Sequence, residues 1–146
     1  MDRTGELKEL ILKTYNKNNH FGRFLDMNYE VLSPVNIKYQ LSVKEDLLAT
    51  PTAAHGGAIA GFMDAIVGVA ALSATAPDGR VVSTVEFKIN YLRPAPFNDT
   101  IIGIGTVLKK GKSILVVRGE IFDSKNQLIA TALATMNSYP VEKSSF

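Results

Sequence analysis

The sequence has no cysteine, only two histidines and nearly balanced charge, and each of these shortages excludes a class of function. Without cysteine the chain has no disulfides, no thiolate nucleophile and no thiolate metal ligand, and it gives no sign of an oxidising compartment. His20 and His55 lie far apart and no H-E-x-x-H spacing occurs, so we expect no metal site. Sixteen Lys and Arg against fourteen Asp and Glu leave a net charge of +2, which argues against a nucleic-acid partner.

The N-terminus mixes charged with apolar residues and lacks the continuous hydrophobic stretch of a signal peptide, so we expect a cytoplasmic protein. Residues 58–76 are apolar over a length that could span a bilayer, with Asp64 as the one ionisable group. An aspartate in the middle of a spanning helix would cost about 2.5 to 3.5 kcal/mol, and basic anchors are absent from both ends. We therefore predict a helix buried in a globular core, and no membrane.

The length of 146 residues and a hydrophobic content of 46% predict one globular domain over residues 1–146. Apolar residues at helical spacing predict an amphipathic lead-in helix within residues 1–20, capped by Asp2 or Thr4. The core should lie at about 29–137, and the polar residues 140–146 should form a frayed tail. Neither G-x-G-x-x-G nor a phosphate-loop motif occurs, so we expect no nucleotide cofactor.

Strand patterns flank the apolar helix, with two strands over residues 29–43 and four after the turn Pro77-Asp78-Gly79. The first of the four alternates a set predicted to face the core with a set predicted to face solvent. The core-facing set is Val85, Phe87, Ile89 and Tyr91, and the solvent-facing set is Thr84, Glu86, Lys88 and Asn90. An antiparallel sheet wrapped around one helix that is apolar nearly all round is an α+β architecture.

The start and the middle of this helix carry the candidate chemistry. His55-Gly56-Gly57 leads into it, and the free N–H groups of a first helical turn can hold an anion or a developing oxyanion, although two glycines also simply permit a tight turn. Asp64 lies on a stripe of small residues that includes Ala60 and Gly61, which suits the close approach of a second helix or a thin ligand. The alternative without function is a buried aspartate satisfied by neighbouring backbone.

The distance between the helix start and Asp64 indicates how many chains would be needed to form one site. Gly57 and Asp64 are seven residues apart, about 10.5 Å along a helix axis, whereas a reacting carbonyl needs both groups within about 3 Å. If they serve one site, Asp64 must come from a second subunit whose helix runs antiparallel to the first. A homodimer with two equivalent interfacial sites follows, and whether dimers pair into tetramers stays open.

These residues resemble the hotdog-fold acyl-CoA thioesterases, specifically the phenylacetate-degradation (PaaI-like) group. The resemblance covers about residues 29–137 and rests on the helix motif H-G-G-x6-D-x3-G-x-A-A and on the strand segment TVEFKINYLRPA, residues 84–95. The motif residues are His55, Gly56, Gly57, Asp64, Gly68, Ala70 and Ala71. The resemblance implies a hotdog fold and hydrolysis of an acyl-CoA or aryl-acyl-CoA without a cofactor, coenzyme A being part of the substrate.

The resemblance also implies roles for individual residues. The Gly57 amide would polarise the thioester carbonyl, and Asp64 of the partner subunit would act as nucleophile or as general base for water. Thr84 would hold that water or the carboxylate, while His55 would shape the loop or help to polarise the carbonyl. The acyl group would enter near Ala60 and Gly61.

Coenzyme A carries phosphates that need cationic partners. Arg93 at the end of the strand segment is one candidate, and the hairpin lysines are others, although lysines also decorate exposed hairpins for solubility. The candidate substrate-binding residues are Gly56, Ala60, Gly61, Asn90, Arg93, Lys109, Lys110 and Lys112.

One departure keeps other functions open. The family often has an asparagine six residues before the histidine, where this chain has Ala49, so Thr50 or Thr52 would have to replace its hydrogen bond. A non-catalytic acyl-CoA binding or sensing module on the same fold is the first alternative. A hotdog dehydratase with His55 as base is the second, and it has less support because those enzymes pair the histidine with acidic partners in a different motif.

Overall fold

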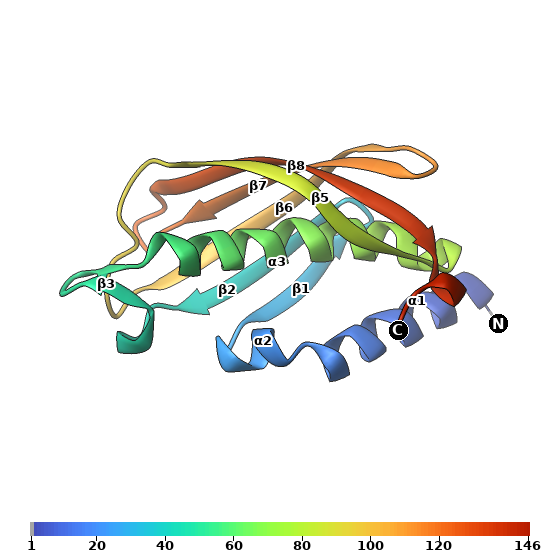
Figure 1. Cartoon of the computed structure of the whole chain (residues 1–146), viewed down its shortest axis with the longest axis horizontal. Helices are drawn as coiled ribbons and strands as arrows, with labels where there is room; N and C mark the ends of the chain where they lie inside the picture. Colours follow the sequence, from blue (N-terminus) through green and yellow to red (C-terminus); the bar gives the residue numbers. More distant parts are fainter. Residues whose placement is uncertain (1) are drawn as a thin grey trace.

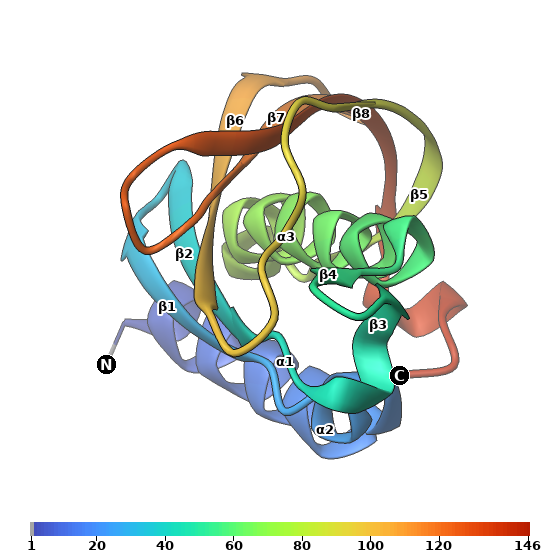
Figure 2. The ribbon, with the colours of Figure 1, turned by 90° about the vertical axis from the view of Figure 1, so that its left-hand side faces the viewer.

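The computed structural model describes residues 2–146, and it shows a six-stranded antiparallel sheet that curves around one long helix. The strand order is β1-β2-β6-β7-β8-β5, so β1 and β5 form the two edges. Figure 2 shows α3 in the concavity of the sheet, with α1 and α2 beside it on the open side. The α+β hotdog architecture predicted from the sequence is confirmed.

The elements follow the predicted order with shifted ends. The helices are α1 Arg3–Asn18, α2 His20–Phe24 and α3 Gly56–Thr75, with short 3-10 turns at Glu45–Leu47, Ala76–Asp78 and Val141–Lys143. The sheet strands are β1 Asn28–Ser33, β2 Asn36–Ser42, β5 Arg80–Tyr91, β6 Thr100–Lys110, β7 Ile114–Phe122 and β8 Leu128–Pro140. A separate small hairpin pairs β3 Leu48–Thr50 with β4 Ala53–Ala54, directly before α3.

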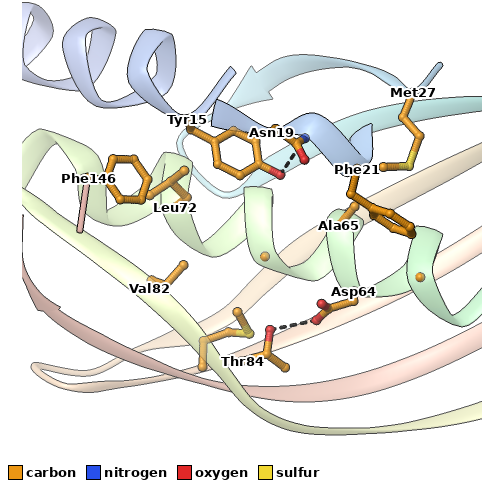
Figure 3. Close-up of a pocket in the computed structure, with 13 residues that line it drawn as sticks. Tyr15, Asn19, Phe21, Met27, Asp64, Ala65, Leu72, Val82, Thr84 and Phe146 are labelled. Atoms are coloured by element: carbon orange, nitrogen blue, oxygen red, sulfur yellow. Dashed lines mark hydrogen bonds between the residues drawn. The ribbon is translucent and has the colours of Figure 1, made fainter. Parts of the chain in front are cut away.

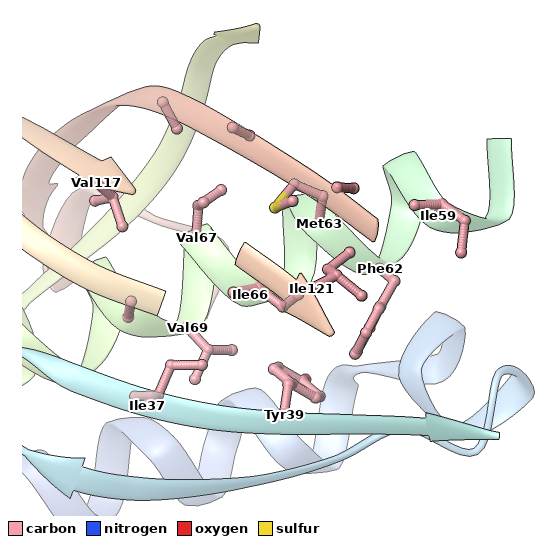
Figure 4. Packing of buried hydrophobic residues seen from close by; sticks show 14 of the residues in the cluster. Ile37, Tyr39, Ile59, Phe62, Met63, Ile66, Val67, Val69, Val117 and Ile121 are labelled. Carbon is pink, nitrogen blue, oxygen red and sulfur yellow. The ribbon is translucent and has the colours of Figure 1, made fainter. Parts of the chain in front are cut away.

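Helix α3 is the centre of the core. Its large side chains are buried against the concave face of the sheet, where they meet residues such as Ile37, Tyr39 and Ile121 (Figure 4). These buried large side chains include Ile59, Phe62, Met63, Ile66 and Val69, whereas Leu72 belongs to a second buried cluster with Ile11 of α1. The segment Gly56–Asp78 is long and apolar enough to cross a membrane, yet 61% of its most apolar stretch is buried inside the fold. Its apolar composition is therefore accounted for by the core.

Helix α3 lies close to the sheet because the strands beneath it carry glycines. Gly103, Gly105 and Gly119 face the helix from β6 and β7, and a side chain at any of them would collide with it. At Gly105 a Cβ atom would lie 2.8 Å from the backbone oxygen of Ile66 and 2.9 Å from the Cβ atom of Ala70. A backbone atom cannot turn aside as a flexible side chain can, so this position fixes the distance between helix and sheet.

We expect Gly105→Ala to lower the free energy of unfolding by about 1 to 3 kcal/mol, the usual cost of overpacking a core. Gly68→Ala is the matched control, since a Cβ atom there would meet only the Cε atom of Met136, at 4.0 Å. The control should leave stability unchanged or raise it by up to about 1 kcal/mol, because alanine favours the helix. Urea unfolding at one protein concentration measures both, and equal stabilities for the two variants would contradict this account.

The N-terminal end of the chain agrees with the sequence prediction, and the C-terminal end differs from it. Helix α1 begins with the Asp2 side chain accepting a hydrogen bond from the Thr4 N–H at 3.1 Å, as predicted, while Met1 lies outside the described residues. The predicted frayed tail is wrong: β8 continues to Pro140, and the Val141 N–H donates to the Gly79 carbonyl at 3.0 Å. The last residue, Phe146, lies over the face of α3 that the sheet leaves open, beside Leu72 (Figure 3).

Candidate active site

Asp64 points from the middle of α3 into a cavity of about 260 Å³ (Figure 3). Its side chain is exposed in the single chain, so the alternative of a sealed aspartate satisfied by backbone is wrong. Thr84 Oγ1 of β5 donates a hydrogen bond of 2.7 Å to Asp64 Oδ1. The structure thus brings together two residues, twenty positions apart, that only the family resemblance had placed in one site.

Thr84 reaches Asp64 because β5 contains a β-bulge. The pairing of β5 with β8 shifts register between Thr84 and Glu86, leaving Val85 as the extra residue. A bulge reverses the alternation of side chains, so Thr84 before it and Phe87 after it both face α3. The strict alternation predicted from the sequence, with Val85 facing the core and Thr84 facing solvent, is therefore wrong; Val85 is 58% exposed.

The start of α3 is held by two side chains. His55 is the N-cap residue, and its Nδ1 accepts a hydrogen bond of 2.8 Å from the Gly57 N–H. Tyr91, predicted to face the core, is 52% exposed, and its hydroxyl donates to the Gly56 carbonyl at 2.9 Å. Within residues 2–146 no hydrogen bond satisfies the Gly56 N–H. One amide of the first turn is thus free, and the amide assigned by resemblance to the carbonyl is occupied by His55.

The hydrogen bond from the Gly57 N–H to His55 should contribute to the stability of the fold. We expect His55→Ala to lower the free energy of unfolding by about 0.5 to 2 kcal/mol, the usual cost of removing an N-cap. His55→Asn should recover most of the loss, because asparagine is a strong N-cap acceptor. Denaturant unfolding of the three proteins is the measurement, and an alanine variant as stable as the parent would show that the ring contributes nothing as a cap.

Helix α3 is continuous between its two functional parts. With no break from Gly56 to Thr75, Gly57 and Asp64 stay about 10.5 Å apart along the axis. Gly61 lies between them and lines the cavity, where a Cβ atom would lie 3.1 Å from the ring of Phe21; Ala60 is half-buried on the next face. A single chain therefore does not bring the helix start and the carboxylate to one carbonyl group.

The cavity beside Asp64 is walled by both ends of the chain. Tyr15, Asn19 and Phe21 enclose it from α1 and α2, and Phe146 closes another side. Asn19 Nδ2 donates to the Tyr15 hydroxyl at 3.1 Å. Burial, and to a lesser extent the negative charge of Asp64, raise the pKa of Tyr15, so this hydroxyl stays neutral around pH 7. Sequence reasoning placed no residue of α1 or α2 in the site, because only spatial packing brings them there.

The candidate coenzyme residues do not form one group in the single chain. Lys110 Nζ donates to the Ala74 carbonyl at 2.9 Å and to Asp78 at 2.6 Å, which satisfies the C-terminal end of α3. Lys109 and Lys112 are exposed on the same hairpin. Arg93 instead lies near the other end of α3, where it lines a cavity of about 370 Å³ with Gly56 and Tyr91. The hairpin and Arg93 are thus separated by most of a helix about 30 Å long.

Within residues 2–146 no three His, Asp or Glu side chains lie close enough to hold a metal ion. Asn90, the remaining candidate, is exposed on β5 opposite Thr131 of β8.

Comparisons with known proteins give the class of the molecule. The sequence profile of the Thioesterase superfamily matches residues 52–130, which include α3 with Asp64 and β5 with Thr84. The chain therefore belongs to the thioesterase superfamily, a family of hydrolases, as the sequence motif predicted. A protein of Saccharolobus solfataricus whose name assigns it provisionally to the esterases is 31% identical over 128 residues, covering 86% of this chain and 87% of the relative.

Solved structures show the same fold. The PaaI protein of E. coli, from the phenylacetic acid degradation operon, superposes with a TM-score of 0.81 at 17% identity, over 92% of this chain and 94% of that one. A Streptococcus mutans protein, whose structure was solved bound to acetyl CoA, superposes with a TM-score of 0.71 at 24% identity, over 78% of this chain and 89% of that one. Both likenesses support the hotdog fold.

Proposed function

We propose that the protein is an acyl-CoA thioesterase whose site is formed by two chains, with Asp64 of one chain acting on a thioester held at the α3 start of the other. The observation that carries this proposal is the 2.7 Å hydrogen bond that orients the Asp64 carboxylate beside an open, largely apolar cavity. The sequence family and the acetyl CoA bound to a protein of the same fold favour this substrate class.

The edge of the sheet favours pairing with a second copy. Strand β5 is twelve residues long, bonds to β8 on one side only, and exposes Val85 and Tyr91. A long edge strand with apolar side chains is a template for another strand. Pairing of two β5 edges about a two-fold axis would set the two α3 helices antiparallel, so that Gly57 of one chain approaches Asp64 of the other.

Thioester hydrolysis at such a site would use the Asp64 carboxylate, one water molecule and the amides at the start of α3. Asp64, as general base, takes a proton from water while the water oxygen attacks the thioester carbon; as nucleophile, it attacks that carbon itself and water later cleaves the anhydride. Amides at the α3 start hold the negative oxygen of the tetrahedral intermediate. The carbon–sulfur bond breaks as the carbonyl re-forms, and the thiolate takes up a proton. Thr84 fixes the direction of the carboxylate in either route.

The hydrogen bond between His55 and Gly57 limits which amides can bind the substrate carbonyl. Because His55 Nδ1 accepts from the Gly57 N–H, the substrate carbonyl must replace the imidazole before that amide can polarise it. The Gly56 N–H can contribute without such an exchange. A role for His55 as dehydratase base is disfavoured, since its Nδ1 serves as the helix cap.

The coenzyme would lie along the cavity that runs from Gly56 to Arg93. The Arg93 guanidinium, just after the end of β5, is exposed there and suits a phosphate, and the exposed Asn90 of β5 is a further polar candidate. Lys110 already bonds to the Ala74 carbonyl and to Asp78 at the end of α3. We therefore assign the coenzyme phosphates to Arg93 rather than to the hairpin lysines.

A non-catalytic acyl-CoA binder is the second candidate, and Ala49 favours it. The residue is exposed in β3 and offers no polar side chain to a water, while the neighbouring Thr50 hydroxyl accepts from the Ala53 N–H at 3.1 Å. A thiol-release assay with short, long and aromatic acyl-CoA substrates separates the two candidates. Thiol release on any of them supports the enzyme, and tight acyl-CoA binding without release on all of them supports the binder.

A further inference from the structure

We propose that the α1–α2 segment and Phe146 form the outer wall of the acyl pocket in the same chain as Asp64, and that Phe21 sets the size of the acyl group. This inference rests on the proposed function, since it assigns the acyl group to the cavity beside Asp64. It also names the substrate class: compact acyl groups without a charge.

The wall is made by side chains that the hotdog core does not require. Phe21 lies on the five-residue helix α2 and is 54% exposed, and a Cβ atom at Gly61 of α3 would lie 3.1 Å from its ring. Phe146 approaches from the opposite end of the chain. Both rings line the cavity beside Asp64 (Figure 3). Neither belongs to the main buried core, so their placement is better explained by the cavity they enclose than by folding.

The floor of the cavity is kept open by Gly68. A Cβ atom there would have open space around it, with Met136 Cε at 4.0 Å as its only neighbour. Gly68 lies one helical turn after Asp64, so a larger side chain at this position would fill the pocket next to the carboxylate without displacing the core. The positions of Phe21 and Gly68 therefore allow the same cavity to be enlarged or reduced.

The volume and the charge of the cavity define its occupant. An apolar cavity of about 150 Å³ takes up benzene, so about 260 Å³ holds a ring with a short arm or a chain of similar bulk. A long fatty-acyl chain would have to displace the wall. Among the thirteen lining side chains one is a carboxylate, Asp64, and none is a cation, so an acyl group that ends in a second carboxylate meets repulsion without a counter-charge.

The test compares Phe21→Ala with Phe24→Ala, which removes the same ring from the same helix outside the pocket; Phe24 is 77% exposed. A third variant, Gly68→Val, reduces the pocket. The readouts are kcat/KM for butyryl-, benzoyl-, palmitoyl- and glutaryl-CoA, and the Kd of the matching non-hydrolysable thioethers. The parent should prefer butyryl- and benzoyl-CoA over palmitoyl- and glutaryl-CoA.

We expect Phe21→Ala to raise the palmitoyl-to-butyryl ratio at least about tenfold, Gly68→Val to lower the benzoyl-to-butyryl ratio by a similar factor, and Phe24→Ala to change neither. Equal ratios in all four proteins, or a parent that prefers the palmitoyl or glutaryl ligands, would overturn the inference. If no thioester is hydrolysed, the proposed function fails, and the thioether Kd ratios still decide whether Phe21 and Gly68 set the size of the pocket.

Discussion

Asp64→Asn should lower kcat for thioester hydrolysis by about 10²- to 10⁴-fold, the usual contribution of a positioned acid or base. Asparagine has nearly the shape of aspartate, and its side-chain oxygen can still accept the hydrogen bond from Thr84. It can neither take a proton from water at neutral pH nor attack the thioester. The loss should therefore fall on kcat, while substrate binding changes little.

Two control measurements test whether the Asp64→Asn variant still folds and assembles like the parent. Size-exclusion chromatography and denaturant unfolding should show an assembly and a stability no lower than those of the parent, because Asp64 is exposed in the single chain and holds no core contact. Thiol release by Asp64→Asn at the parental rate would remove this residue from the mechanism. In an active parent, label from heavy-oxygen water found on Asp64 after a single turnover would indicate direct attack rather than activation of water.

The second large effect should come from the edge of the sheet. Val85→Lys places a charge at the bulge of β5, and lysine on an edge strand opposes pairing with another strand. Because the Val85 side chain is 58% exposed in the single chain, the substitution should cost the protomer little stability. We expect the variant to be monomeric and to lose essentially all hydrolysis, since neither chain would then supply a complete site.

Leu133→Lys is the matched control for this edge variant. Leu133 is exposed to a similar extent, 52%, but lies on β8, which is paired on both sides. The control should keep both the dimer and the activity. A Val85→Lys protein that is monomeric and fully active would refute a site shared between two chains. A Val85→Lys protein that remains a dimer with normal activity would show that the dimer interface does not lie at the β5 edge.

The sequence was sufficient for the elements whose signals are local. The apolar run of α3 and the motif around Asp64 predicted the central helix and its acid, and the turn at Pro77-Asp78-Gly79 separated that helix from the later strands. These predictions succeeded because hydrophobic periodicity and turn residues act over a few positions. The motif also named Thr84, although the alternation of its own strand placed Thr84 on the opposite face.

The features that could not be predicted from the sequence depend on contacts between residues that lie far apart in the chain. A single extra residue at Val85 reverses the faces of β5, and a bulge leaves no clear mark in an alternating sequence. The glycines beneath α3 are informative only when the helix above them is known. The same holds for Phe21 and Phe146, which lie far apart in the sequence and line different sides of the cavity beside Asp64 (Figure 3).

The central claim, that one chain supplies the helix start and its partner the carboxylate, is tested most directly by mixing two inactive proteins. One carries Asp64→Asn, and the other carries Gly56→Pro, which removes the free amide proton at the first helical position, where proline is tolerated. After subunit exchange, each mixed dimer should contain one intact site, so an equal mixture should recover about a quarter of the parental activity. Two dimeric, folded variants that exchange subunits and stay inactive would contradict the claim.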